Sequence, residues 1–166
     1  MPQKKPAPRP SPQDYNSVVD AAELLDVKLI KSSFDLQPHF FAAEDQDLDF
    51  RYTCDLERSS YDAESKVLLG QIALEAGSKV GRKWVLRVRS TYVVAYSISG
   101  EPPEDAATGY LERVARFTAY PYFRAHFASL CSDAGAKVPP LPVLKGNVPT
   151  RILGDAAPEA AKLNAP

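Results

Sequence analysis

Few side chains in this sequence belong to the types that most often carry out acid–base or nucleophilic chemistry. His39 falls in an expected loop and His126 in an expected helix, where a solvent or interface histidine is commoner than a catalytic one. Cys54 lies on the apolar side of an alternating strand and Cys131 follows Leu130 on a helix, which is typical of packed thiols. The sequence therefore predicts that the protein is not an enzyme.

Sequence motifs for cofactors and metals do not occur either. The chain contains no phosphate-binding loop, nucleotide-binding glycine fingerprint, His-Glu-x-x-His zinc helix or Gly-x-Ser-x-Gly elbow. Two cysteines are too few for a disulfide framework or a thiolate metal site, which favours a reduced, cytoplasmic protein. We expect neither a cofactor nor a metal.

Charged residues form two local groups in a chain of formal net charge −1. The acidic group falls on the exposed side of a strand, where solvation explains it better than catalysis, and comprises Asp47, Asp49, Asp55 and Glu57. The basic group comprises Lys79, Arg82, Lys83, Arg87 and Arg89. It could contact RNA, but without an exposed aromatic stacking motif a solvated edge or an acidic partner is the more ordinary interpretation. We expect no nucleic-acid partner.

The chain of 166 residues is long enough for one domain with its own core. Composition predicts a disordered Pro-rich tail at residues 1–14, a single domain at 15–154 and a C-terminal tail at 155–166. No apolar stretch of signal-peptide length follows the basic first residues, and no run of about 18 apolar residues occurs anywhere. Membrane insertion is not expected.

Four strands are predicted from apolar and polar alternation. The clearest are Leu48 to Glu57 and Trp84 to Ile98, and the less regular ones are Val27 to Gln37 and Val67 to Ala76. A phase slip near Ile30 predicts a bulge in the first strand. Strands followed by helices predict an α+β fold, in which C-terminal helices cover a four-stranded antiparallel sheet of Greek-key or meander type.

Three helices are expected around these strands. A Ser-x-x-Asp box at Ser17 to Asp20 predicts a short helix from Val18 to Leu25. A second helix, at about 106–117, is expected to lead through a kink or break into a third, because Pro121 lacks an amide hydrogen and fits best in a first turn. Gly135 is expected to end the third helix in the left-handed conformation.

A proline-rich apolar arm follows that helix and reaches Leu144. Its prolines exclude helix and central-strand pairing, so the arm must either cover the core or line a groove. More apolar surface comes from Phe40 and Phe41 in a loop and from Tyr120, Tyr122 and Phe123 near the expected break. This surplus predicts oligomerisation, a peptide-binding groove, or both.

The segment from Arg116 to Leu144, RFTAYPYFRAHFASLCSDAGAKVPPLPVL, resembles the SecB protein-export chaperones. Their helix carries a Phe/Tyr-Pro-Tyr-x-Arg segment, followed by a turn and a Pro-Leu arm. The strand order, the long strand ending at Ile98-Ser99-Gly100 and the place of the aromatic loop also fit, so the likeness covers about residues 27–144. The Tyr-Pro-Tyr and Pro-Pro-Leu motifs resemble even more closely those of SecB-like chaperones of toxin–antitoxin systems.

The resemblance implies a homo-tetramer, a dimer of dimers, that holds unfolded or precursor polypeptides in apolar grooves without ATP. It places substrate contacts at Leu36, Phe40, Phe41, Leu141, Val143 and Leu144. The aromatic segment around the expected break is predicted to form the oligomer interface, with Tyr120, Tyr122, Phe123 and Phe127.

Two departures from the family concern its partners. Export chaperones dock on the SecA motor through an acidic sheet surface, whereas Arg87 and Arg89 stand on the long strand here. The family's zinc-contacting C-terminal end has little counterpart in residues 155–166. We therefore expect holdase activity more than a role in export, and leave SecA docking open. The alternatives are a dedicated chaperone of one antitoxin and a purely structural oligomeric module.

Overall fold

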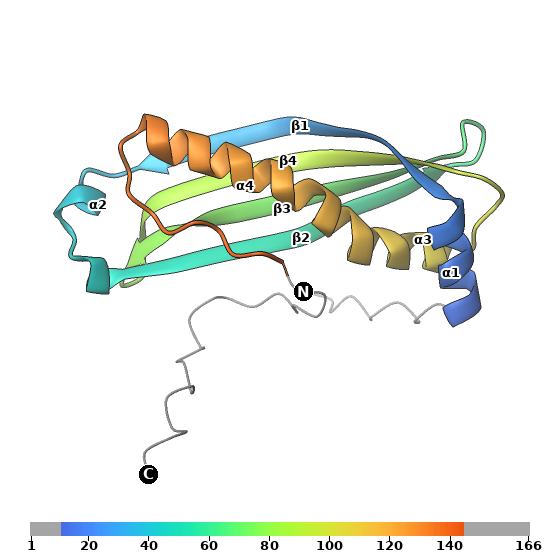
Figure 1. The fold of residues 1–166 in the computed structure, drawn as a ribbon, viewed down its shortest axis with the longest axis horizontal. Coiled ribbons are helices and arrows are strands. Elements are labelled where there is room, and N and C mark those ends of the chain that lie inside the picture. The colour runs from blue at the N-terminus through green and yellow to red at the C-terminus, as the bar shows by residue number, and fades with distance from the viewer. Residues whose placement is uncertain (1–10, 145–166) are drawn as a thin grey trace, which may run out of the picture.

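A computed structural model describes residues 11–144, in which helix α4 lies diagonally across one face of a four-stranded antiparallel sheet (Figure 1). The helical elements are α1 (Pro12–Ala21), α2 (His39–Ala42), the 3-10 turn η1 (Asp45–Asp47), α3 (Glu104–Tyr110), the π-helical η2 (Leu111–Ala115) and α4 (Arg116–Asp133). The strands are β1 (Ala22–Leu36), β2 (Leu48–Asp62), β3 (Val67–Val80) and β4 (Lys83–Ile98).

The strand order β1-β4-β3-β2 makes β1 and β2 the two edges of the sheet. Strands β2, β3 and β4 are joined by hairpins, and β1 pairs with the other side of β4. The connection from β1 to β2 carries α2 and η1. All three pairings are antiparallel, so the predicted fold class is confirmed.

The first helix begins earlier than the sequence predicts. Ser11 caps α1 by accepting a hydrogen bond from the Asp14 amide over 3.1 Å, and Pro12 occupies the first turn, where its missing amide hydrogen costs nothing. The predicted box at Ser17 therefore lies inside the helix. Leu24 and Leu25, predicted as helical, belong to β1.

Strand β1 has register shifts between Leu24 and Asp26 and between Leu29 and Lys31. The second shift confirms the bulge predicted near Ile30. Strand β2 extends to Asp62, beyond the predicted end at Glu57. A third register shift, between Leu56 and Arg58, changes which side chains face the core, so the alternation of apolar and polar residues does not continue past it.

The chain runs as a helix through Pro121, so the break predicted there is wrong. The irregularity lies earlier, in η2, where the backbone takes a π-helical turn. Tyr120 and Phe123 on either side of the proline are buried, whereas Pro121 itself is exposed. Packing against the sheet stabilises the helix across a residue that disfavours it.

The core lies between the helices and the sheet. Its largest fully buried side chains include Phe123 and Phe127 of α4 and Leu111 of η2. Close packing depends on Gly70 of β3, where an added Cβ would lie 3.1 Å from the Leu111 side chain.

The predicted tails fall mostly beyond this structure. Residues 12–14 belong to α1, while residues 1–10, the domain limit expected at 154 and the tail at 155–166 lie outside the described part of the chain. Among residues 11–144, no helix has both the length and the apolar character needed to cross a bilayer.

Candidate functional site

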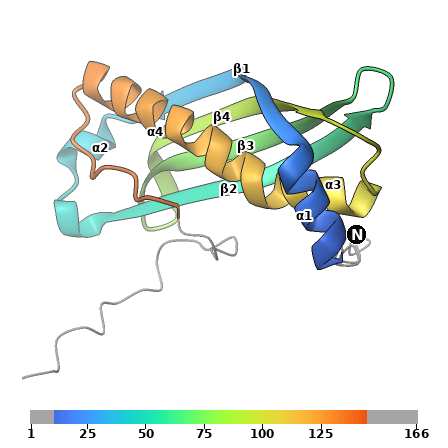
Figure 2. The ribbon, with the colours of Figure 1, turned by 45° about the vertical axis from the view of Figure 1, so that its right-hand side comes forward.

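Residues 136–144, here called the arm, pass between the end of α4 and α2 and run toward β2 (Figures 1 and 2). Leu141 is only 1 % exposed and Ala136 is also buried, so the arm contributes to the core. The Tyr120 hydroxyl donates a hydrogen bond to the carbonyl oxygen of Pro142 over 2.6 Å. The arm is thus held at its start by the burial of Ala136 and near its end by Leu141 and Pro142.

The anchoring hydroxyl keeps its proton over the physiological pH range. Burial raises the pKa of Tyr120 to about 12, and the neighbouring Tyr52, whose ring centroid is 6.2 Å away, acts in the same direction. Tyr120 therefore remains a hydrogen-bond donor to the arm wherever the protein is folded near neutral pH.

The turn into the arm is a Schellman motif. The Ala136 amide donates to the Cys131 carbonyl over 2.8 Å, the Gly135 amide donates to the Ser132 carbonyl over 3.0 Å, and Gly135 has φ +66°. The prediction that Gly135 ends the helix is confirmed. This motif fixes the direction in which the arm leaves α4.

A groove of about 570 Å³ lies between the last turns of α4 and the arm. Phe127, Cys131 and Leu141, all buried, form its floor, and Ala128 and Val138 line its walls. Its volume is in the range of protein sites that bind a small ligand or a few side chains of a peptide. The arm therefore both covers the core and lines a groove.

The six predicted substrate contacts differ in accessibility. Phe40 is 5 % and Leu141 1 % exposed, so the chain itself covers both, because α2 turns Phe40 inward and the arm folds back onto α4. Phe41 is 59 % and Val143 68 % exposed. The remaining two are half-buried, namely Leu36 and Leu144. Four of the six side chains are therefore available for contact with a partner.

Three of the four residues predicted at the oligomer interface lie in the core instead. Tyr120, Phe123 and Phe127 are each less than 5 % exposed, and only Tyr122 is accessible. The unbroken helix turns positions 120, 123 and 127 toward the sheet, where the Phe127 ring meets Phe50 at a centroid distance of 6.0 Å. In the isolated chain these three side chains leave almost no surface for contact with another subunit.

Both cysteines are packed thiols, as predicted. Burial raises the pKa of Cys54 to about 12 and that of Cys131 to about 11, so neither is a thiolate at neutral pH. His126 lies in α4 with its Nε2 atom 2.9 Å from the Ser32 hydroxyl of β1. Within residues 11–144, no three His, Cys, Asp or Glu side chains are grouped as metal ligands.

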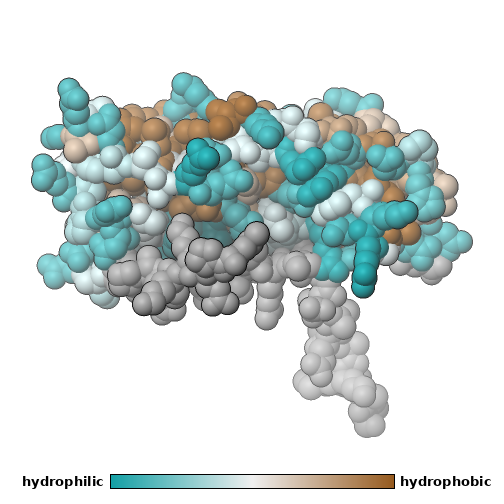
Figure 3. All heavy atoms as spheres, turned by 180° about the vertical axis from the view of Figure 1, so that it is seen from behind, coloured by the Kyte–Doolittle hydropathy of each residue, from teal (hydrophilic) through white to brown (hydrophobic). Residues whose placement is uncertain are grey.

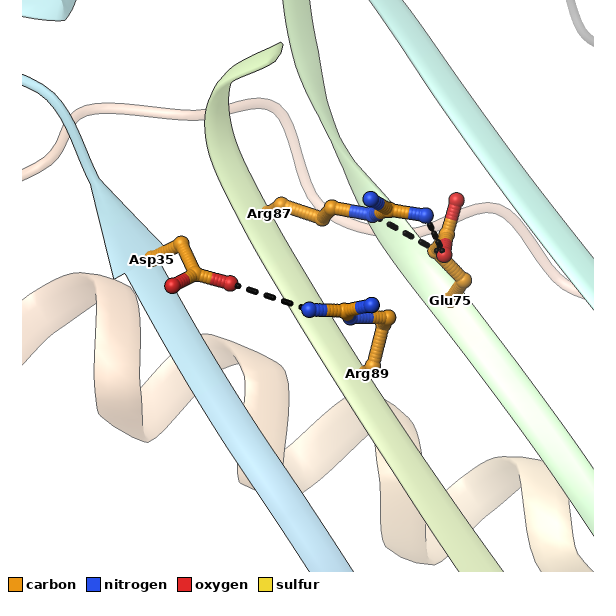
Figure 4. A network of polar contacts seen from close by, with 4 residues as sticks. All are labelled: Asp35, Glu75, Arg87 and Arg89. Carbon is orange, nitrogen blue, oxygen red and sulfur yellow. Dashed lines mark hydrogen bonds and ion pairs between the residues drawn. The ribbon is translucent and has the colours of Figure 1, made fainter.

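The sheet face opposite α4, here called the open face, carries paired charges. Arg87 donates to Glu75 through Nε at 3.0 Å and Nη2 at 2.6 Å, and Arg89 lies 3.4 Å from Asp35 (Figure 4). Hydrophilic side chains are spread over this face, with apolar patches between them (Figure 3). For these arginines the sequence left a solvated edge or an acidic partner open, and in the structure each lies beside an acid on a neighbouring strand.

Two features of the site were missed by the sequence analysis. Arg124 and Lys137 also line the groove, and they belong to one site only because the arm turns back along α4. The edge strand β1 exposes a row of large apolar side chains, namely Leu24, Leu25, Leu29 and Ile30. A signal for this row was present, because apolar residues occupy both parities of β1 around the bulges.

Comparison with known proteins finds similarity in structure rather than in sequence. No protein-family model matches the chain, and no curated protein is similar to it in sequence. Its structure is similar to that of the Mycobacterium tuberculosis SecB-like chaperone Rv1957 in complex with a ChAD peptide from the HigA1 antitoxin Rv1956. The TM-score is 0.66 at 17 % identity, over 82 % of this chain and 99 % of that one.

The chain has a SecB-like fold. At this identity the similarity concerns the fold alone, and it covers nearly the whole length of the neighbour. The SecB-like fold, the groove and the anchored arm are the observations from which a function can be proposed.

Proposed function

We propose that the protein is an ATP-independent chaperone that holds unfolded or precursor polypeptides in the groove between α4 and the arm. The observation that carries this proposal is an accessible apolar groove of about 570 Å³ with a buried floor, built into a SecB-like fold. Unfolded chains expose apolar side chains that such a groove can cover. The proposal includes no nucleotide or metal.

Apolar residues beyond the groove extend the proposed contact surface. Phe41 of α2 and Val143 of the arm have more than half of their surface exposed, on the two segments that the figures place side by side (Figures 1 and 2). Covering such a side chain contributes about 1.5 to 3 kcal/mol. Proline in the arm limits the entropy that ordering would cost on binding. Several weak apolar contacts suit a binder of many sequences.

A dedicated role for one antitoxin is the second candidate. It is supported by one specific observation, that the SecB-like neighbour was solved with a peptide from an antitoxin. Affinity capture with the tagged protein separates the two candidates: one abundant partner supports a dedicated chaperone, and many unrelated partners support a general one.

Export is the weaker assignment. Docking on the SecA motor through the sheet would need an acidic surface, and the open face instead matches Arg87 with Glu75 and Arg89 with Asp35. We therefore propose holding activity without assigning the export pathway. Buried free thiols are compatible with a reducing compartment, and we propose the cytoplasm.

A homo-oligomer is proposed through β1 rather than through the aromatic residues of α4. Among residues 11–144 no strand pairs with the outer edge of β1, and Leu24, Leu25, Leu29 and Ile30 of this strand are 43–56 % exposed. A long apolar edge of this kind is normally covered by pairing with another strand. A second copy offers an identical edge, and two such dimers would give the tetramer expected from the resemblance.

Aggregation suppression tests the proposed function. A chemically denatured, aggregation-prone protein is diluted into buffer with the chaperone candidate, and light scattering is followed without nucleotide. Suppression near equimolar ratio is expected, with lysozyme at the same mass concentration as the inert control. Full scattering at several-fold molar excess would contradict the proposal.

A further inference from the structure

Two cations stand at the groove, and neither makes an ion pair with an acidic residue of the described part of the chain. Arg124 belongs to α4 and Lys137 to the arm, so the groove has one positive charge on each wall, and both side chains are exposed. The ion pairs found among residues 11–144 involve Lys28, Arg51, Arg87 and Arg89 instead.

Carboxylates do not line this groove in the described part of the chain. Its remaining lining is uncharged, including the buried Cys131 thiol. Asp133, at the end of α4, is not among the lining residues. The groove therefore combines an apolar floor with a net positive charge, although the whole chain has a formal net charge of −1.

The end of α4 could oppose this positive charge, because a helix C-terminus carries partial negative charge. In the Schellman motif, however, the carbonyls of Cys131 and Ser132 accept hydrogen bonds from the amides of Ala136 and Gly135. The positive charge of Arg124 is felt inside the site, because it lowers the pKa of Tyr120 against the burial that raises this pKa to about 12. A negative ligand would meet the two cations first.

We propose that the groove selects apolar polypeptide segments that carry a carboxylate side chain. Apolar side chains of the segment lie on Phe127, Cys131 and Leu141, and its carboxylates lie near Arg124 and Lys137, which both line the groove. The inference rests on the proposed chaperone function and gives it a substrate class, namely apolar segments with acidic residues. Basic apolar segments are disfavoured by the same two charges.

A pair of peptides tests this selectivity on the full chain. Both are short, apolar and labelled with the same fluorophore, and they differ only in aspartates that replace asparagines. The aspartate peptide is expected to bind about three- to ten-fold more tightly in low salt, the range for two partly solvated ion pairs. At about 1 M salt, where the screening length is about 3 Å, the difference should largely disappear.

Two double variants locate the effect. Replacing Arg124→Gln together with Lys137→Gln should abolish the preference, so that the aspartate peptide binds no more tightly than the asparagine peptide. The matched control, Arg58→Gln with Lys66→Gln, removes two exposed cations that make no described ion pair and lie toward the β2–β3 turn at the other end of the molecule, and should keep the preference (Figure 1). A single Arg124→Lys variant keeps the charge and should keep most of the effect.

The outcomes separate this inference from the proposed function. Equal affinity of the parent for both peptides, with clear binding, overturns the selectivity and leaves the chaperone proposal standing. Binding of neither peptide, together with full aggregation of a denatured client, overturns both. A preference that survives in the Arg124 and Lys137 double variant, folded by circular dichroism, overturns the assignment to these two residues.

Discussion

The hydroxyl of Tyr120 connects the proposed binding surface to the core. It donates to Pro142 at 2.6 Å while its ring packs beside Tyr52. A Tyr120→Phe variant keeps the ring and removes the bond, so the free energy of unfolding should fall by about 0.5 to 1.5 kcal/mol, or more if the Pro142 carbonyl loses water as well. Urea denaturation measures this loss.

Client binding should weaken in the same variant, because the arm is then held less firmly. The matched control is Tyr122→Phe, since Tyr122 is 53 % exposed on the same helix. Equal stability of the two variants would show that the hydrogen bond does not hold the arm in solution.

Adjacent phenylalanines should have opposite phenotypes. Phe40 is buried, so Phe40→Ala should lower the free energy of unfolding by about 3 kcal/mol or more. Phe41 is 59 % exposed, so Phe41→Ala should leave the melting temperature nearly unchanged and reduce affinity for an unfolded client up to about ten-fold. Paired thermal melts and binding titrations test this. A binding defect in Phe40→Ala but not in Phe41→Ala, at equal foldedness, would show that the contact was assigned to the wrong residue.

Helix α4 is continuous because tertiary packing outweighs its proline. Pro121 is exposed, lies inside the helix and supplies no amide hydrogen to the helical ladder. Pro121→Ala should therefore raise the free energy of unfolding, by up to about 3 kcal/mol, without changing the oligomeric state. Urea denaturation and light scattering measure both. A required break at residue 121 would instead give a less stable, dissociated variant.

The individual elements differ in how far sequence could predict them. The alternation from Trp84 to Ile98 predicted β4 almost to the residue, and Gly135 predicted the helix end, because both signals are local. The helix through Pro121 and the burial of Phe123 depend on packing against a sheet that lies far away in sequence. Local rules therefore predicted a break that the tertiary contacts remove.

The candidate site was predictable only in outline. Prolines indicated an arm, and the surplus of aromatic residues indicated a binding surface. Which side chains stay accessible was not predictable, because Phe40 and Leu141 are covered only after the connection and the arm fold back. Arg124 and Lys137 line the same groove for the same reason.

At the scale of the whole molecule, the protein should lose stability in alkali. Burial raises the pKa of several tyrosines, with Tyr110 and Tyr120 reaching about 12, and raises that of Cys54 to about 12. The unfolded chain therefore loses protons first, so stability is unaffected below about pH 9 and falls between about pH 9 and pH 12.

Urea denaturation at a series of pH values measures this fall. Tyr110→Phe removes one of the groups and should make it shallower, with the exposed Tyr122→Phe as the control. Stability that stays constant to pH 11 would contradict the burial described here.

Site-specific photo-crosslinking tests the central claim most directly, that unfolded polypeptide is held between α4 and the arm. A photoreactive residue at Ala128, which is exposed and lines the groove, is compared with one at Ser60, which is exposed on β2. The account predicts crosslinks from position 128 to a denatured client, none to the same client once folded, and few from position 60. Equal yields from both positions, or none from position 128 while aggregation is still suppressed, would contradict it.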